Sequence, residues 1–230
     1  MHSFYCGTIP EENNLAELEE RDRKHLFKTL RAKPGEKIAL MDGLGITAEA
    51  VVEEGTILRV LSRRVFTKPA SGIHLFISPP RKNKMDDLLK QCAEIGFSSI
   101  NPIIAERTVS EPDRNSIENR WKTLLIEGCK QSGNPFLPEL RMPLPLREAV
   151  SFIVSRGMKA YFGSVRETCH EISGGHETAW IVGPEGGFTQ EEEKLMKDNS
   201  FTAIKIGQWT LRIETAAICG AAVLLSAIKG

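Results

Sequence analysis

The sequence lacks the features that mark several common classes of protein. It has no excess of one charge, because 30 lysines and arginines balance 30 aspartates and glutamates, so the chain as a whole does not attract nucleic acid or acidic lipid. Its longest weakly polar run, residues 216–228, is shorter than the about 20 apolar residues of a membrane-spanning helix. The N-terminal residues form neither a basic nor an apolar segment of the kind that directs secretion. We expect a soluble cytoplasmic protein that does not enter a membrane.

Cysteine is scarce and scattered. The five cysteines are an odd number and lie far apart, which argues against both a disulfide framework and a CxxC zinc site. Cys169, His170 and His176 are close in the sequence, but adjacent side chains of an extended segment point to opposite faces. Structural zinc also needs a closed set of four ligands. We therefore expect no metal.

The first 70 residues have the pattern of a small β domain. Residues 37–66 contain three strand-like runs, KIALM, ITAEAVVEE and TILRVLSRRVF, separated by DGLG and by Gly55. Alternation of apolar and polar residues between such turns indicates antiparallel hairpins. Residues 15–30 read as a polar helix or turn. We expect a mostly β unit and interpret it as a closed barrel.

Residues 73–230 have a different pattern, in which predicted strands alternate with predicted helices. Strands are expected at IHLFISP, SINPII, KAYFGS, TAWIVGP and TAIKIG, and helices at MDDLLKQCAEIG, IENRWKTLLIEGCKQSG, LREAVSFIVSRG, TQEEEKLMKDN and IETAAICGAAVLLSAI. This alternation predicts a parallel α/β sheet covered by helices on both faces. The last helix is rich in small residues, which let it pack close to another backbone as a core or interface element.

The sharpest motif is the glycine-rich run 183–187, GPEGG. It lies between the apolar run AWIV and a capping box formed by Thr189 and Glu192. Open α/β folds bind ligands at such turns, because glycine lets a ligand approach the backbone closely. The spacing matches neither the pyrophosphate nor the triphosphate motif, and Glu185 argues against a phosphate ligand. A tight turn that binds nothing is the alternative.

Residues 206–216, IGQWTLRIETA, also lead from a strand end into a helix. Arg212 and Glu214 are charged residues at the start of this otherwise apolar helix. In a purely structural interpretation, these residues form a salt bridge, and Glu214 is an acidic residue that the helix dipole favours near the N-terminus. Their functional interpretation is a charged group beside a ligand.

Two stretches are locally basic despite the neutral total. Residues 21–37 carry seven basic side chains against two acidic ones, and residues 59–84 carry seven basic side chains and no acidic one. If they share a face, they form a footprint for a phosphate backbone; a solvated charged surface is the alternative. The candidate RNA-binding residues are Arg31, Arg63, Arg64, Arg81, Lys82 and Lys84.

IVGPEGGFTQEE followed by LRIETAA resembles the ribosomal small-subunit RNA methyltransferase E family, which methylates N3 of a uridine in 16S rRNA and belongs to the SPOUT superfamily. The resemblance covers nearly the whole chain. Further pieces that match the family pattern in order are His25, Leu30-Arg31, Pro34-Gly35, Asp42-Gly43, Gly45, Met85, Glu94-Ile95-Gly96, Pro102, Glu106-Arg107, Glu127 to Cys129 and Gln131-Ser132-Gly133.

The resemblance implies a PUA-like RNA-binding β-barrel at residues 1–70 and an α/β SPOUT methyltransferase domain with a trefoil knot at residues 73–230. It also implies a homodimer that binds S-adenosylmethionine and acts on 16S rRNA or the small ribosomal subunit. The cofactor-binding residues carried over from the family are Phe162, Gly163, Gly183, Pro184, Glu185, Gly186, Ile206, Gly207, Leu211 and Arg212.

Methylation of uracil N3 requires loss of the N3 proton or stabilisation of the resulting anion. Arg212 is the candidate cation for the uracil oxygens, and Glu185 and Glu214 are the candidate bases. Because pairing hides N3 in a duplex, the target uridine should be unpaired or flipped out.

The chain departs from the family pattern where Trp209, Asn134 and Gln91 stand in place of frequent cations. Three other functions stay open. A related methyltransferase with a different RNA target would modify another RNA, and a ribosome-binding module would bind rRNA without transferring a methyl group. An enzyme that uses a nucleotide would bind ATP or GTP in place of S-adenosylmethionine.

Overall fold

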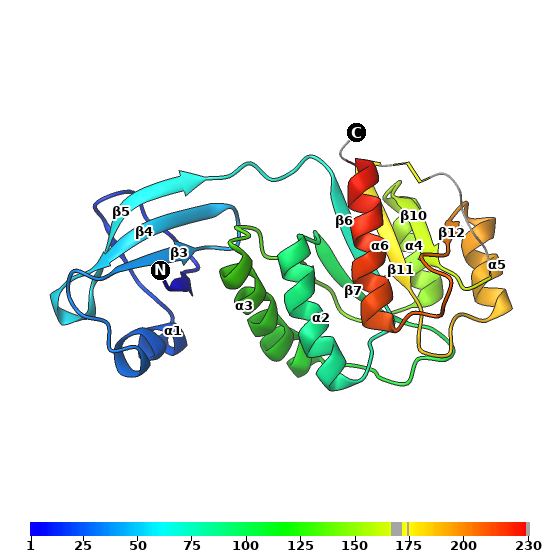
Figure 1. Cartoon of the computed structure of the whole chain (residues 1–230), viewed down its shortest axis with the longest axis horizontal. Helices are drawn as coiled ribbons and strands as arrows, with labels where there is room; N and C mark the ends of the chain where they lie inside the picture. Colours follow the sequence, from blue (N-terminus) through cyan, green and yellow to red (C-terminus); the bar gives the residue numbers. More distant parts are fainter. Residues whose placement is uncertain (167–171, 174, 229–230) are drawn as a thin grey trace. The chain divides into compact units, whose positions relative to one another are not determined.

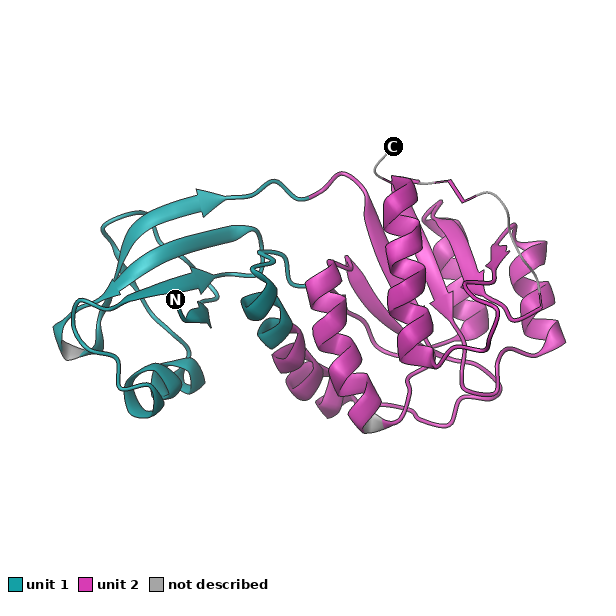
Figure 2. Cartoon of the chain, viewed as in Figure 1, with its two compact units in different colours: residues 1–68, 126–137 teal, residues 69–125, 138–230 magenta. Residues whose placement is uncertain are grey.

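The chain folds into two compact units, shown in Figures 1 and 2. The computed structural model describes residues 1–166, 172–173 and 175–228. Unit 1 consists of residues 1–68 and 126–137, and unit 2 of residues 69–125 and 138–230.

Unit 1 is built on a mostly antiparallel sheet. Its strands are β1 (Ser3–Tyr5), β2 (Leu15–Ala16), β3 (Lys37–Met41), β4 (Ile46–Val52) and β5 (Leu58–Val65), in the order β1-β3-β4-β5-β2. The ladders from β3 to β4 and from β4 to β5 are the predicted hairpins. The turn between β3 and β4 uses positive φ at Gly43 and Gly45, which glycine adopts without strain.

The polar segment before these hairpins is helical. It contains α1 (Glu20–Lys24) and a π-helical turn (His25–Thr29), where the sequence predicts a polar helix or turn; a short 3₁₀ turn (Glu54–Thr56) precedes β5. Leu26 is buried and joins the core that the sheet encloses. The other members of this core include Phe4, Cys6, Ile38, Leu40, Ala50, Val52, Leu58 and Val60.

A side chain joins the two end strands of this sheet. The Cys6 thiol, which follows β1, donates to the carbonyl oxygen of Glu17, which follows β2, at 3.3 Å. Within the residues that the structure describes, no ladder pairs β1 with β2. The five strands therefore form one ladder whose two end strands, β1 and the two-residue β2, are joined through the Cys6 thiol.

Unit 2 contains a parallel sheet with the order β12-β10-β11-β6-β7-β8, and β9 also pairs with β7. Every ladder in it is parallel, as predicted. In chain order the elements after residue 69 are β6 (Gly72–Ile77), α2 (Lys82–Ile95), β7 (Ser99–Ile104), a π-helical segment (Ser116–Trp121), α3 (Lys122–Ser132), β8 (Glu139–Leu140), β9 (Leu144–Pro145), α4 (Leu146–Ser155), β10 (Lys159–Gly163), β11 (Glu177–Val182), α5 (Gln190–Asp198), β12 (Thr202–Ile204) and α6 (Ile213–Ile228). Helix α3 is divided between the units, since residues 126–132 belong to unit 1.

Helices cover both faces of the sheet (Figure 1). Because side chains alternate along a strand, Ala179 and Ile181 of β11 join the apolar cluster that includes α4 and α5. Trp180, between them, points to the other face and contacts α6. The mixture of Val, Ile, Phe and Trp in the central strands reflects burial on both sides.

The last helix packs very close to the sheet. The indole Nε1 of Trp180 donates to the carbonyl oxygen of Ala216 at 3.2 Å. A Cβ atom added at Gly220 would lie 2.3 Å from the Trp180 ring, so only glycine fits there. This contact explains why position 220 of α6 is occupied by the smallest residue.

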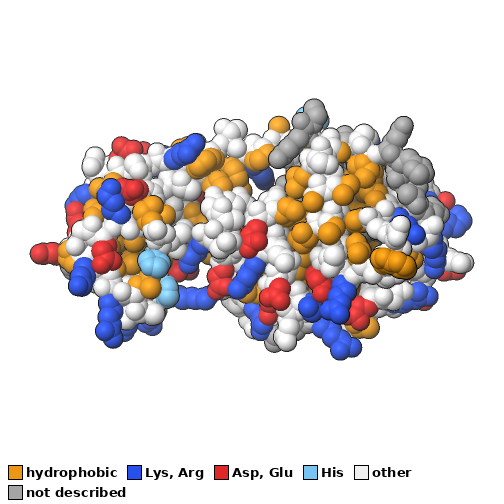
Figure 3. Space-filling view, viewed as in Figure 1, with side chains coloured by type: hydrophobic (Ala, Val, Ile, Leu, Met, Phe, Trp, Pro, Cys, Tyr) orange, Lys and Arg blue, Asp and Glu red, His pale blue; other side chains and the backbone are white. Residues whose placement is uncertain are grey.

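The opposite side of α6 is open and weakly polar. Hydrophobic side chains gather over this helix in Figure 3. The exposed positions recur at intervals of three and four residues, so they form one stripe. They are Thr215, Cys219, Ala222, Val223 and Ser226.

Candidate functional site

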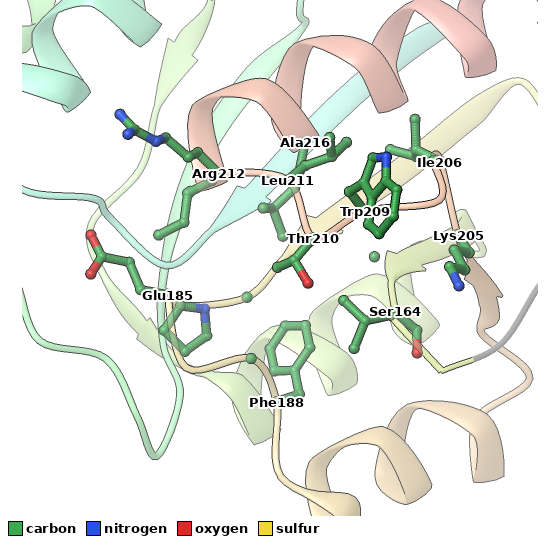
Figure 4. Close-up of a pocket in the computed structure, with 18 of the residues that line it drawn as sticks. Ser164, Glu185, Phe188, Lys205, Ile206, Trp209, Thr210, Leu211, Arg212 and Ala216 are labelled. Atoms are coloured by element: carbon green, nitrogen blue, oxygen red, sulfur yellow. The ribbon is translucent and has the colours of Figure 1, made fainter.

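The loops after β10, β11 and β12 enclose a pocket of about 610 Å³. It lies at the carboxyl ends of parallel strands, where open α/β sheets bind ligands, and its volume suits a small molecule. The residues that line it come mainly from 163–165, 182–188 and 204–214. The two motifs singled out in the sequence therefore face the same space (Figure 4).

The glycine-rich turn is held in one conformation from within. The Gly187 backbone N–H donates to the Pro184 carbonyl at 2.8 Å, and Gly187 has a φ of 68°. A Cβ at Gly183 would lie 2.9 Å from the ring of Phe188, which is buried. Thr189 then caps α5, and the predicted capping box with Glu192 is present. At Gly183, Gly186 and Gly187 the turn therefore presents only backbone to the pocket.

The pocket has two chemically different ends. In Figure 4, Glu185 and Arg212 extend toward the same side, whereas Ser164 and Lys205 lie on the opposite side. Glu185 and Arg212 are both exposed, so a ligand can reach them from solvent. Trp209 also lines the pocket and is 82% exposed. One end thus offers both a carboxylate and a guanidinium.

Lys84 also lines this pocket, although the sequence suggested an RNA phosphate contact for it. It lies in the first turn of α2, and its Nζ is 3.5 Å from Oε1 of Glu214 in the first turn of α6. Contact between these two helices brings the pair together. The sequence could not show this pairing because the two residues are 130 positions apart.

The other cofactor residues expected from the resemblance lie in or beside the pocket. Gly163, Gly183, Pro184, Gly186, Ile206, Gly207 and Leu211 all line it. Phe162 does not: its side chain is fully buried in the core that contains Phe188. Sequence reasoning placed Gln208 and Thr210 in the expected loop 206–212 without naming them, and it missed the lining residues Ser164, Val165, Phe188 and Lys205. Ser164 and Lys205 directly follow the ends of β10 and β12, which is a signal that could have found them.

The locally basic stretches are partly neutralised by acidic residues from elsewhere in the chain. Arg59 bonds to Glu53 through two nitrogens; this pairing lowers the pKa of the Glu53 carboxyl. Lys37 pairs with Glu49 at 2.7 Å. The excess of positive charge counted along the sequence is therefore smaller on the folded surface.

Arg63 and Arg64 point to opposite faces of the sheet. A register shift at Glu49/Ala50 places Arg63 opposite Ala48 and Arg64 opposite Thr47. Since residues opposite each other share a face, Arg63 lies on the side of buried Ala48, and it pairs with Glu11 at 3.0 Å. Arg64 is exposed and its guanidinium lies 4.6 Å from the centre of the Phe66 ring. This placement argues against a phosphate contact by Arg63.

The remaining basic candidates are divided between the units. Arg31 is exposed in unit 1 and has a φ of 55°. Arg81 is exposed and precedes α2 in unit 2. Lys82 belongs to α2, but its side chain is outside what the structure describes.

In the described part of the chain, no group of three or more His, Cys, Asp or Glu residues could hold a metal ion. Cys169 and His170 lie outside the described residues. Burial raises the pKa of the Cys92 thiol and raises that of Cys129 to about 12, so both stay protonated at neutral pH. The described helices also include none that is long and apolar enough to cross a membrane.

Comparison with known proteins gives consistent matches over both units. A family model for an RNA methyltransferase domain matches residues 67–225, and one for an RNA methyltransferase PUA domain matches residues 18–57. Ribosomal RNA small subunit methyltransferase E 2 of Borreliella burgdorferi is 30% identical over 84% of this chain and 84% of its own length. Ribosomal RNA small subunit methyltransferase E of Aquifex aeolicus is 26% identical over 98% of this chain and 100% of its own.

Solved structures give the same result. Ribosomal RNA small subunit methyltransferase E from Neisseria gonorrhoeae, bound to S-adenosyl methionine, has a TM-score of 0.87 at 28% identity, and the match covers 98% of this chain and 97% of that one. A Legionella pneumophila protein solved with the bound cofactor SAM has a TM-score of 0.85 at 27% identity, with the same coverage of both chains.

Proposed function

The chain belongs to the RNA methyltransferase family, and we propose from this membership that it transfers a methyl group from S-adenosylmethionine to N3 of a uridine in the 16S rRNA of the small ribosomal subunit. The family matches confirm the predicted PUA-like domain and the α/β methyltransferase domain of the SPOUT type. The observation that carries the proposal is the pocket, which three strand-end loops form and which has Glu185 and Arg212 at one end. The trefoil knot and the domain limits 1–70 and 73–230 stay predictions.

The pocket fits S-adenosylmethionine. Apolar lining from Val182, Phe188, Ile204, Ile206 and Leu211 suits an adenine ring, and the glycines leave room for a ligand to approach the backbone closely. When bound, this cofactor supplies an electrophilic methyl group on a sulfonium. The residues proposed to hold it are Gly163, Gly183, Pro184, Glu185, Gly186, Ile206, Gly207, Leu211 and Arg212, with Phe162 supporting Gly163 from the core.

The charged end of the pocket is proposed to bind the uracil and to accept its N3 proton. The Arg212 guanidinium would lie beside the uracil oxygens and favour the N3 anion, and the Glu185 carboxylate would accept the N3 proton. Glu214 is already engaged by Lys84 at 3.5 Å, which makes Glu185 the better placed carboxylate. Reaching N3 requires an unpaired or flipped uridine.

Trp209 is proposed to assist in holding RNA. It stands where the family usually has a cation, and its indole is largely exposed beside the pocket. An exposed aromatic ring can stack on an unpaired base. Such stacking would compensate for the missing cation without adding charge.

Labelled S-adenosylmethionine and small ribosomal subunits that lack the modification provide the direct test. We expect label in 16S rRNA and its recovery as 3-methyluridine after nucleoside analysis. Label in another nucleoside would reject the uridine N3 assignment but keep the methyltransferase. Binding of rRNA without transfer would favour a ribosome-binding module instead. Because the substrate is rRNA, the proposed place of action is the cytoplasm.

Replacing Arg64 with alanine is expected to weaken RNA binding and to lower the slope of log affinity against log salt by about 0.9 for a duplex contact. The reason is the loss of one exposed cation from the outer face of β5. Titration with an rRNA fragment at several salt concentrations measures the affinity and its salt dependence. Arg63→Ala is the matched control, because Arg63 is paired with Glu11 and should leave the slope unchanged. Equal slopes for wild type and Arg64→Ala would contradict the assignment.

The homodimer is proposed on the exposed stripe of α6. Small and apolar side chains on one side of a helix allow close packing against a second copy across a two-fold axis. Light scattering at micromolar concentration should therefore give about twice the monomer mass of 25.6 kDa. Ala222→Arg places a charge in the stripe and should yield monomers. A monomeric wild-type protein with full activity would refute the interface.

A further inference from the structure

The glycine-rich turn is also held from outside the pocket. Arg107 follows β7, and its Nη1 donates to the carbonyl oxygen of Gly186 at 2.8 Å. Arg107 is not among the residues that line the pocket. It therefore contacts the turn that forms one wall of the pocket without lining the pocket itself.

Gly186 is the residue on which this contact depends. A Cβ at Gly186 would lie 3.2 Å from Cδ and 3.6 Å from Cβ of Arg107. The φ of Gly186 is not in the positive range that requires glycine. The side chain of Arg107 thus crowds this position in the structure, and glycine lets that side chain lie across the turn.

The neighbouring residues fix both partners. The Glu106 backbone N–H donates to Oε1 of Glu192 at 2.8 Å, and Oε2 of the same carboxylate accepts from Thr189 N at 2.9 Å. The turn that carries Arg107 is closed by hydrogen bonds between Ala105 and Thr108. Residues 106 and 107 therefore hold the segment 186–192 near both its ends.

We propose that Arg107 is a positioning residue, which holds the Gly186 carbonyl and thereby orients the glycine-rich turn for cofactor binding and for the placement of Glu185. This inference rests on the proposed function. A site that is already ordered binds its ligand without a further loss of conformational entropy, and reacting groups must be held within a fraction of an ångström. Without Arg107 the turn would keep its internal bond between Gly187 and Pro184 but lose its external one.

Calorimetry with S-adenosylmethionine on the purified full chain tests the proposal. Arg107→Ala should weaken binding by about tenfold, the size expected for one charge-assisted hydrogen bond. Because Arg107 is exposed, the melting temperature should hardly change. Arg107→Lys keeps a long chain and a cationic donor and should restore part of the affinity. Unchanged affinity in Arg107→Ala would overturn the proposal.

A double-mutant cycle with Gly186→Ala separates positioning by Arg107 from a direct role of the glycine. In the wild-type background the new Cβ crowds Arg107 at 3.2 Å and strains its bond to the Gly186 carbonyl, so we expect weaker binding. In the Arg107→Ala background the atom at 3.2 Å is gone, and Gly186→Ala should add little. Additive effects would mean that the cofactor itself needs Gly186 and would overturn the coupling. Failure of the wild-type protein to bind S-adenosylmethionine would instead reject the proposed function.

Discussion

Replacing Arg212 with alanine is expected to lower the rate of methyl transfer by about a hundredfold, or about 2.7 kcal/mol of transition-state stabilisation. Arg212 and Glu185 extend toward the same end of the pocket (Figure 4), and loss of the guanidinium would leave the uracil anion without a cation. The Arg212 carbonyl accepts from Ala216 N at 2.8 Å, a backbone contact that alanine keeps, so α6 should still begin correctly. The measurement is turnover at saturating S-adenosylmethionine and RNA.

Lys205→Ala is the matched control for this experiment. Lys205 is a cation that lines the same pocket but lies at its opposite end. Its removal should change turnover far less than the removal of Arg212. Wild-type turnover in Arg212→Ala would reject the catalytic role of Arg212. Catalysis would then depend on Glu185, on Glu214 or on a residue of a second subunit.

Gly220→Val is expected to destabilise the protein by about 3 kcal/mol or to prevent folding, because overpacking a filled core forces shifts of backbone and side chains. The first added atom would lie 2.3 Å from a fully buried tryptophan ring. Urea unfolding of the purified variant measures the change in the free energy of unfolding. Trp180→Phe, which removes part of the ring, should recover some stability in the milder Gly220→Ala variant. Equal stability of Gly220→Val and wild type would contradict the close packing of Gly220 on Trp180.

Much of the fold follows from local patterns. KIALM coincides with β3, SINPII with β7, and the Thr189 capping box with the start of α5. These elements depend on alternation and on side chain to backbone contacts within a few residues. Parallel strands all end at the same edge of a sheet. The sequence could therefore also predict that the glycine-rich turn and the IGQWTLR segment, which both follow strands, lie at one edge.

The parts that could not be predicted depend on contacts between distant residues. The register shift in β4 and β5 reverses the face on which Arg63 lies, and one extra residue leaves no clear mark in an alternating sequence. The Lys84–Glu214 pair and the Arg107–Gly186 bond join segments that only the fold brings together. The prediction that the target base is a uridine depends on the resemblance to a family, since no pattern of charge or spacing identifies a uridine.

The placement of the three tryptophans gives the pocket an optical signal of its own. Trp121 and Trp180 are buried, at 5% and 0% exposure, whereas Trp209 is 82% exposed at the pocket. Water shifts the emission of an exposed indole to longer wavelengths than that of a buried one. The red edge of the fluorescence spectrum therefore belongs mainly to Trp209. Occupancy of the pocket can be followed there without attaching a dye, and collisional quenchers in solution will extinguish that component first.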